Sequence, residues 1–272
     1  RIFTATDGAS PTANAQSIPS KPLAVRHPNG GLVILFGTGR YLGATDTSTT
    51  AKQTFYGIWD QDPSVAPTTP LPTRAKLQQQ TITTLANPIN GQTFRISSAT
   101  DVCWNGDTCT DSGGNTVSGQ SLGWYIDLPG LSATAPAERV TSDPLLVGQN
   151  VVFTSIGPSS DPCEFGGVSW LNVIDATTGK RPSESFVDLA VDDNGNVTAT
   201  PIKADITENG QTTSGAVTSL QQDVITSAPT KMDAPYAINI YTTDSEGKVR
   251  VSHLSAAGLT GRLSWRQLEL EQ

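Results

Sequence analysis

The 272 residues are enough for one large all-β domain or two small ones, each with an ample hydrophobic core. Only 15% of the residues are charged, the net charge is −8 and the pI is about 4.7. This acidic balance argues against binding of nucleic acid and against simple electrostatic binding to anionic lipid. No apolar run approaches the roughly 18 residues that a spanning helix needs, so we expect no membrane span.

The first informative stretch contains two apolar runs, Leu32–Phe36 and Phe55–Trp59, on either side of a loop that opens with Gly-Thr-Gly. A glycine turn after a buried strand suits a nucleotide site or a propeller blade. A dinucleotide site requires G-x-G-x-x-G at the start of a helix, but the third glycine, Gly43, comes one position late and no useful helix follows. We therefore interpret the glycines as blade geometry that holds Tyr41 and Leu42 against the second strand.

Further along the chain, short β-prone runs alternate with turns. The sequence LLVGQNVVFTSI predicts a hairpin, because Gly-Gln-Asn separates two apolar runs. Only residues 219–226, SLQQDVIT, could carry two turns of helix. The other predicted strands are residues 74–84 as a weaker candidate, then Val168–Asp175, and the paired runs Ala237–Thr242 and Lys248–Leu254.

These elements predict an all-β fold, in which short antiparallel strands suit a sandwich, a barrel or a propeller. No period of about 40 residues, as in WD-type propellers, is visible. The segment VIDATTGK resembles the strand-and-turn element of quinoprotein-type blades, where Asp and Gly close the turn after an apolar strand.

Five segments together resemble the C-terminal propeller domain of the PilY family, the tip-associated adhesin and biogenesis proteins of bacterial type IV pili. They occur in the family's order and run from near the start of the chain to its end. The segments are FGTGRYLG followed by QTFYGIWD, then GWYIDLP, ERVTSDPLLVGQNVVFTS, PSSDPCEFGGVSWLNVIDATTG and GRLSWRQL.

The resemblance implies a modified, irregular β-propeller with quinoprotein-like blades, of which residues 1–272 are the C-terminal portion. The chain begins with RIFTATDG, without initiator Met or signal peptide, and we expect a mature fragment or the C-terminal piece of something longer. A propeller closes by pairing its last blade with its first, so part of a ring exposes sheet edges. Either the remainder of the same propeller or partner molecules would cover those edges.

Two of the three cysteines, Cys103 and Cys109, bracket the short loop CWNGDTC. A disulfide that closes this loop is the preferred interpretation, and it indicates an oxidising compartment. Two free thiols are the alternative. Cys163 is either a buried free thiol or has its partner outside this chain.

Some PilY-type proteins carry an EF-hand-like calcium loop, and the nearest match is residues 190–201, AVDDNGNVTATP. Asp192 and Asn194 fit positions three and five, but Ala190 and Pro201 supply no side-chain oxygen at positions one and twelve. A hairpin turn is therefore preferred. No metal site is predicted, and calcium is kept as an alternative. A second acidic cluster is interpreted as solvated: Asp101, Asp107 and Asp111.

The sequence contains no recognisable catalytic constellation. Its two histidines are far apart. His27 precedes a Pro-Asn-Gly turn, which predicts a surface position, and His253 lies in a predicted strand. Neither adjoins a motif such as G-x-S-x-G, and HExxH is absent. No catalytic residue and no cofactor are predicted, because a quinone site needs a complete ring and the adjacent cysteine pair of those enzymes is missing.

The five tryptophans could be contact residues or core residues. Those in strand-like segments are predicted to wedge neighbouring blades as core residues. Trp104, inside the cysteine loop, is instead the first candidate for a contact residue. The four predicted core residues are Trp59, Trp124, Trp170 and Trp265.

The resemblance implies a non-enzymatic adhesin and biogenesis component of the pilus tip, secreted through the periplasm and located at the cell surface. Minor pilins and a host or abiotic surface are the implied partners, contacted through loops and exposed edges. Two alternatives from other classes are a quinoprotein-type dehydrogenase and a structural subunit of an extracellular filament.

Overall fold

The computed structural model describes residues 2–9, 13–65, 71–110, 113–130, 135–159, 166–183, 202–208, 211–233 and 237–255. In these ranges the chain forms eighteen strands and two 3-10 helices, η1 (Ala44–Ser48) and η2 (Arg74–Lys76). The predicted all-β fold is confirmed. No helix in the described ranges is long and apolar enough to cross a bilayer.

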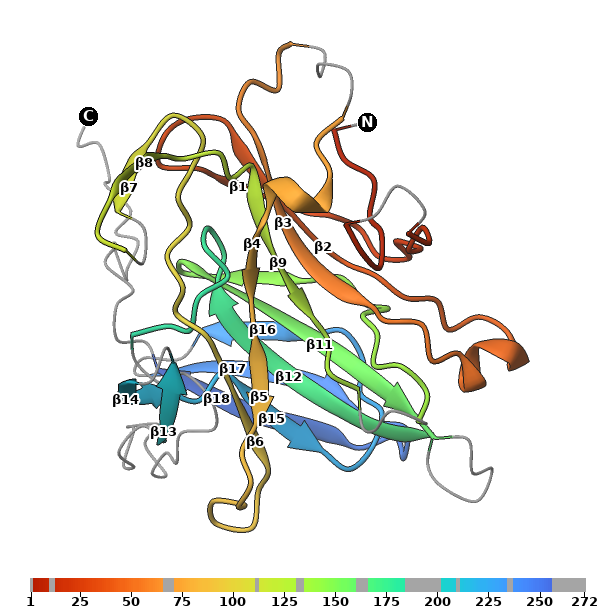
Figure 1. The fold of residues 1–272 in the computed structure, drawn as a ribbon. Coiled ribbons are helices and arrows are strands. Elements are labelled where there is room, and N and C mark those ends of the chain that lie inside the picture. The colour runs from red at the N-terminus through yellow and green to blue at the C-terminus, as the bar shows by residue number, and fades with distance from the viewer. Residues whose placement is uncertain are drawn as a thin grey trace, which may run out of the picture.

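The first sheet contains the two strands predicted around the glycine loop (Figure 1). They pair antiparallel, with Val33 opposite Trp59 and Gly37 opposite Phe55. The last strand of the sheet joins in parallel to its neighbour, which departs from a simple meander. In spatial order the strands are β1 (Leu23–Arg26), β2 (Leu32–Gly37), β3 (Thr54–Asp60), β9 (Gly123–Asp127) and β4 (Gln78–Gln80).

The second sheet begins with the predicted hairpin, in which Val147 pairs with Asn150 across a two-residue turn. Both predicted strands of residues 145–156 and the strand Val168–Asp175 are confirmed. The side chain of Asp175 closes the turn after this strand by accepting hydrogen bonds from the amides of Thr177 and Thr178. In spatial order the strands are β10 (Leu145–Val147), β11 (Asn150–Pro158), β12 (Gly167–Asp175), β15 (Ser219–Gln222), β6 (Phe94–Ser97) and β5 (Ile82–Thr84).

Two local predictions were wrong in detail. Residues 219–226 form no helix, because β15 lies between β12 and β6 and its backbone is taken into both ladders. Tertiary pairing overrides the weak helical preference of SLQQ. Residues 74–84 are not one strand: η2 leads into β4, and β5 then joins the other large sheet.

The remaining strands form one small sheet and two hairpins. The predicted pair at residues 237–254 is confirmed, with Ile238 opposite Leu254. The third sheet is β16 (Thr230–Asp233), β17 (Ala237–Thr243) and β18 (Val249–Ser255), and the hairpins are β7 (Thr108–Thr110) with β8 (Thr116–Ser118) and β13 (Lys203–Glu208) with β14 (Gln211–Ala216).

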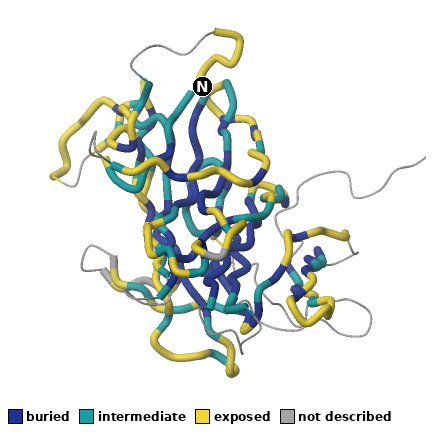
Figure 2. The backbone as a smooth tube through the Cα atoms, turned by 90° about the vertical axis from the view of Figure 1, so that its right-hand side faces the viewer, coloured by how far each residue is buried: buried dark blue, intermediate teal, exposed yellow. Residues whose placement is uncertain are grey.

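Buried backbone segments gather in the middle of the molecule (Figure 2). Two clusters of buried apolar side chains pack on opposite faces of the second sheet. Alternate residues of β11 divide between them: Val151 and Phe153 pack toward the first sheet, whereas Val152 packs toward the third. Phe153 stacks on Phe55 of the first sheet, with ring centroids 3.9 Å apart. Burial on both faces explains why β11 and β12 are mostly apolar instead of alternating.

Successive antiparallel sheets that pack face to face are the arrangement of propeller blades. The parallel β4 and the addition of β6 and β5 to the second sheet make the blades irregular. This stack of irregular, mainly antiparallel sheets agrees with the predicted modified β-propeller.

Candidate interaction site at the disulfide loop

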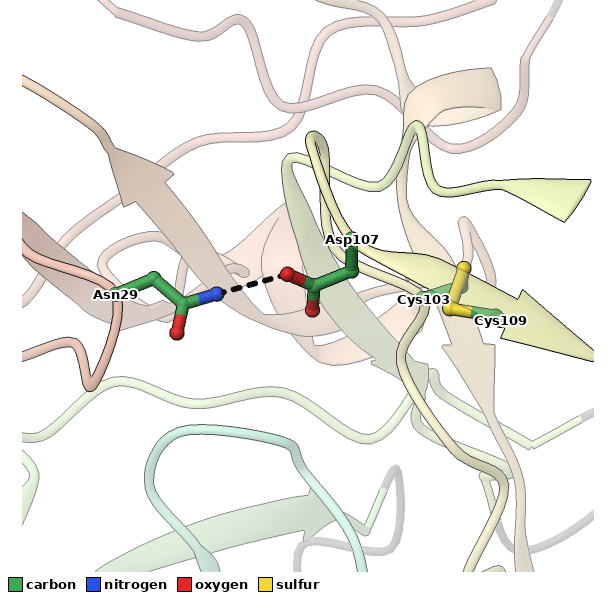
Figure 3. Close-up of a disulfide and its surroundings, with 4 residues drawn as sticks. All are labelled: Asn29, Cys103, Asp107 and Cys109. Atoms are coloured by element: carbon green, nitrogen blue, oxygen red, sulfur yellow. Dashed lines mark hydrogen bonds between the residues drawn. A yellow bond between two sulfur atoms is a disulfide. The ribbon is translucent and has the colours of Figure 1, made fainter.

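The site lies where the turn between β1 and β2 meets the cysteine loop (Figure 3). Cys103 and Cys109 form a disulfide with Cα atoms 6.0 Å apart. The loop is also tied to the chain that follows β8, because the Ser121 amide donates to the Cys103 carbonyl and the Asn105 amide to that of Ser121. The bridge thus closes a loop that the backbone already folds back on itself.

Beneath this loop lies a buried aromatic cluster of His27, Trp59 and Trp104. The imidazole stacks on the indole of Trp59, with centroids 4.2 Å apart, and meets the edge of Trp104 at 4.4 Å. The expected surface position of His27 was wrong, and so was the expectation that Trp104 is an exposed contact residue. Each ring covers the others. The three rings come from separate segments of the chain, which only folding brings together.

A backbone hydrogen bond sets the tautomer of neutral His27. Its Nδ1 accepts a hydrogen bond from the amide of Asn29 at 3.1 Å, so the proton of the neutral ring is on Nε2. Within the described residues Nε2 is buried without a hydrogen-bond partner. Burial lowers the pKa of His27, and the carboxylate of Asp107 opposes that shift. The side-chain Nδ2 of Asn29 also donates a hydrogen bond to Oδ1 of Asp107 at 3.1 Å, which links the turn to the cysteine loop (Figure 3).

This burial predicts a pH-dependent stability. An unfolded histidine titrates near pH 6.5, whereas folded His27 titrates lower. Below about pH 6.5 the unfolded chain therefore binds more protons, and the free energy of unfolding falls as the pH drops through the folded pKa. Urea unfolding between pH 7.5 and 5.5 should show this loss in the natural protein and a smaller loss in His27→Phe.

The control for this prediction is His253→Asn, since His253 lies half-buried on β18 and its Nδ1 is 2.9 Å from the side-chain oxygen of Asn239. This variant should keep the pH dependence of the natural protein. Equal slopes for His27→Phe and the natural protein would exclude His27 as the titrating group.

Removing the disulfide is a second test of the site. Closure of so short a loop stabilises the folded state by about 2 kcal/mol through the lost entropy of the unfolded chain. Cys103→Ser combined with Cys109→Ser should lower the free energy of unfolding by about that amount, measured by urea titration. The indole of Trp104 should also become more accessible to acrylamide quenching. Unchanged stability and quenching would mean that the backbone bonds alone hold the loop.

An open pocket of about 450 Å³ lies beside the loop. The ammonium of Lys76 donates to the side-chain oxygen of Gln120 at its rim, 2.5 Å away. Six of the nine residues that line the pocket are polar: Lys76, Asn105, Asp107, Thr108, Ser118 and Gln120. Together with the exposed β7–β8 hairpin, it offers hydrogen-bonding groups to a partner.

The other predicted site residues are scattered. The two histidines are not brought together: His27 follows β1 of the first sheet, whereas His253 lies on β18 of the third sheet. Asp101 is exposed and pairs with Lys180. No group of three or more potential metal ligands occurs in the described ranges. Outside these ranges lie the 190–201 segment, Asp111, Cys163 and Trp265.

Three predicted core tryptophans are confirmed, because Trp59, Trp124 and Trp170 are all buried. Sequence patterns missed three buried arginines, Arg74, Arg95 and Arg139. The sequence around these arginines carries no signal of their burial, since their partners come from distant segments.

The fold and the site define an all-β, propeller-type protein with a disulfide-closed surface loop. The family model of the PilY1 beta-propeller domain matches residues 2–95. The crystal structure of the Pseudomonas aeruginosa PilY1 C-terminal domain superposes with a TM-score of 0.67 at 28% identity, over 93% of this chain and 48% of that one. The resemblance to the PilY family is thereby confirmed.

Curated relatives extend the comparison. Type IV pilus biogenesis factor PilY1 of Pseudomonas aeruginosa is 36% identical over 198 residues, which are 70% of this chain and 16% of that protein. A PilY1 homolog of Xylella fastidiosa is 33% identical over 153 residues, 56% of this chain and 9% of the relative. The chain therefore spans only a small part of the length of these proteins.

Proposed function

We propose that this protein acts in type IV pilus biogenesis as a non-enzymatic component of the pilus tip that also mediates attachment. The observation that carries the proposal is the match to the PilY1 C-terminal domain over 93% of the chain. Relatives that are 36% identical are named pilus biogenesis factors. Minor pilins and a host or abiotic surface are its proposed partners.

Three features support this role. The disulfide of Cys103 and Cys109 suits secretion through the oxidising periplasm to the cell surface. The β7–β8 hairpin and the polar pocket lie on loops supported by rigid sheets, where binding sites are commonly found. The acidic chain makes a protein or surface partner more fitting than nucleic acid.

The test uses the native, full-length protein in its own host. A strain that lacks the segment corresponding to residues 23–255 should carry fewer surface pili in electron micrographs and attach less, and the intact gene should restore both. Antibody-gold labelling of the intact protein should mark pilus ends. Normal piliation and attachment of the deletion strain would refute the role. Dye-linked oxidation of an alcohol by the purified protein would favour the dehydrogenase alternative instead.

A further inference from the structure

The loop between β2 and β3, residues 38–53, presents the sequence Arg40-Tyr41-Leu42 at the surface. It extends from the right-hand side of the molecule in Figure 1 and carries η1. Leu42 is 85% exposed, the most exposed large apolar residue in the described ranges. Our expectation that Leu42 packs against the neighbouring strand was therefore wrong.

An internal carboxylate holds the first half of this loop. The Oδ2 atom of Asp46 accepts hydrogen bonds from the amides of Leu42 and Gly43, at 2.9 and 3.0 Å. Its Oδ1 atom accepts from Nε of Arg40 at 3.1 Å. These bonds lower the pKa of Asp46 to about 2, so the carboxylate stays ionised and the turn that displays Leu42 stays closed.

The buried side chain of Arg139, which lies far from this loop in the sequence, bonds to the backbone of the loop. The guanidinium of Arg139 donates from Nη1 to the carbonyls of Arg40 and Asp46, at 2.8 and 2.6 Å, and from Nη2 to that of Thr49. Gly39 permits this approach: its φ is +119°, and a Cβ there would lie 2.3 Å from that of Arg139. Arg139 thus bonds to the loop backbone and lies 5.9 Å from the centre of the Tyr41 ring. The side chains of Arg40 and Leu42 remain exposed.

The pairing of β2 with β3 does not require an ordered loop of this length between them. β2 and β3 already pair from Leu32 with Asp60 to Gly37 with Phe55, and a two-residue turn can join such a pair. Connections between hairpin strands usually have about 2–5 residues, and much longer ones are often functional. Burying a guanidinium is costly unless it is fully hydrogen-bonded, and here its bonds serve to fix an exposed segment.

We propose that Arg40-Tyr41-Leu42 is a docking epitope for a pilin subunit, with Leu42 entering an apolar pocket and Arg40 facing a carboxylate at its edge. The side chain of Arg40 is 58% exposed, so N–H groups remain for a partner beside its bond to Asp46. The exposed guanidinium of Arg40 offers a local positive charge that is complementary to a carboxylate of the partner. A pre-ordered loop also binds with less loss of entropy. This inference rests on the proposed function.

Site-specific photocrosslinking in piliated cells tests the epitope. The full-length protein would carry Leu42→p-benzoylphenylalanine, with Val65→p-benzoylphenylalanine as the matched control, since Val65 is 63% exposed and lies outside the loop. Irradiation should produce an adduct with a pilin at position 42 and none at position 65, as identified by mass spectrometry. An adduct confined to the protein's own chain, or no adduct, would overturn the proposal.

A binding measurement complements the crosslink. Leu42→Ser should weaken capture of the purified pilin by about tenfold or more, as for other central contact residues. Its melting temperature should stay unchanged because the side chain touches little of the fold, and Val65→Ser should bind as the natural protein does. Equal binding by Leu42→Ser would refute the epitope. Piliation of the deletion strain reports separately on the proposed function.

Discussion

Replacing Arg95 by methionine should lower the free energy of unfolding by about 3–5 kcal/mol, because it leaves a buried carboxylate without its counter-charge. Arg95 and Glu138 are 1% and 0% exposed, with Nη1 lying 2.8 Å from both carboxylate oxygens. Burial lowers the pKa of Arg95, and the charge of Glu138 opposes that shift. The pair joins β6 of the second sheet to the segment that leads from the first sheet into it.

The neighbours of this pair make a change at one partner costly. The guanidinium lies over the ring of Trp170, 3.5 Å from its centre, and Nε donates to the hydroxyl of Thr84. The carboxylate of Glu138 also accepts from the hydroxyl of Ser155 at 2.6 Å. In Arg95→Met the neighbouring groups keep their positions, but the positive charge that compensates the carboxylate of Glu138 is gone.

The experiment is urea unfolding of Arg95→Met, of Glu138→Gln and of the double variant. The double variant should be more stable than the sum of the single losses predicts, because neither charge is then left buried alone. Lys231→Met, which removes one member of an exposed pair with Asp233, should leave the transition unchanged. Additive losses would show that the two side chains contribute independently.

Sequence patterns predicted those parts of the fold whose cause is local. β2, β3, β11 and β12 are apolar runs bounded by turns, and the turn at Gly148 carries its own signature. The elements that were missed depend on distant neighbours instead. β15 is a strand because β12 and β6 lie on either side of it, and no period within SLQQ reports that.

The same division holds at the candidate site. The disulfide could be anticipated because both cysteines lie within one short loop. Burial of His27 and Trp104 could not, since their ring contacts join segments that are about 80 positions apart in the chain. The glycine loop was recognised as a motif, but its order depends on Arg139, whose acceptors lie up to 99 positions away. The exposure of Leu42 could not be predicted from the sequence, because it depends on the bonds between Arg139 and the loop carbonyls.

Replacing Trp124 by alanine should destabilise the protein by roughly 3–5 kcal/mol, the range for loss of a buried aromatic ring with an unfilled cavity. Its indole is fully buried on β9 at the centre of the core between the first and second sheets. The ring occupies the space above Gly57 of β3, its cross-strand partner, where an added Cβ would lie 2.4 Å from the indole nitrogen.

The same contact can be tested from the opposite side, since Gly57→Ala inserts a methyl group where the ring already lies. Overpacking of this kind costs about 1–3 kcal/mol. In the Trp124→Phe background the smaller ring leaves room, so Gly57→Ala should cost less there, and the double-mutant cycle should be non-additive. Urea unfolding of the four proteins measures the difference, with Val117→Ala on the exposed hairpin as the control that leaves stability unchanged. An additive cycle would mean that position 57 requires glycine for the backbone of β3 and not to make room for the indole. The close packing of the first sheet would then depend on another contact.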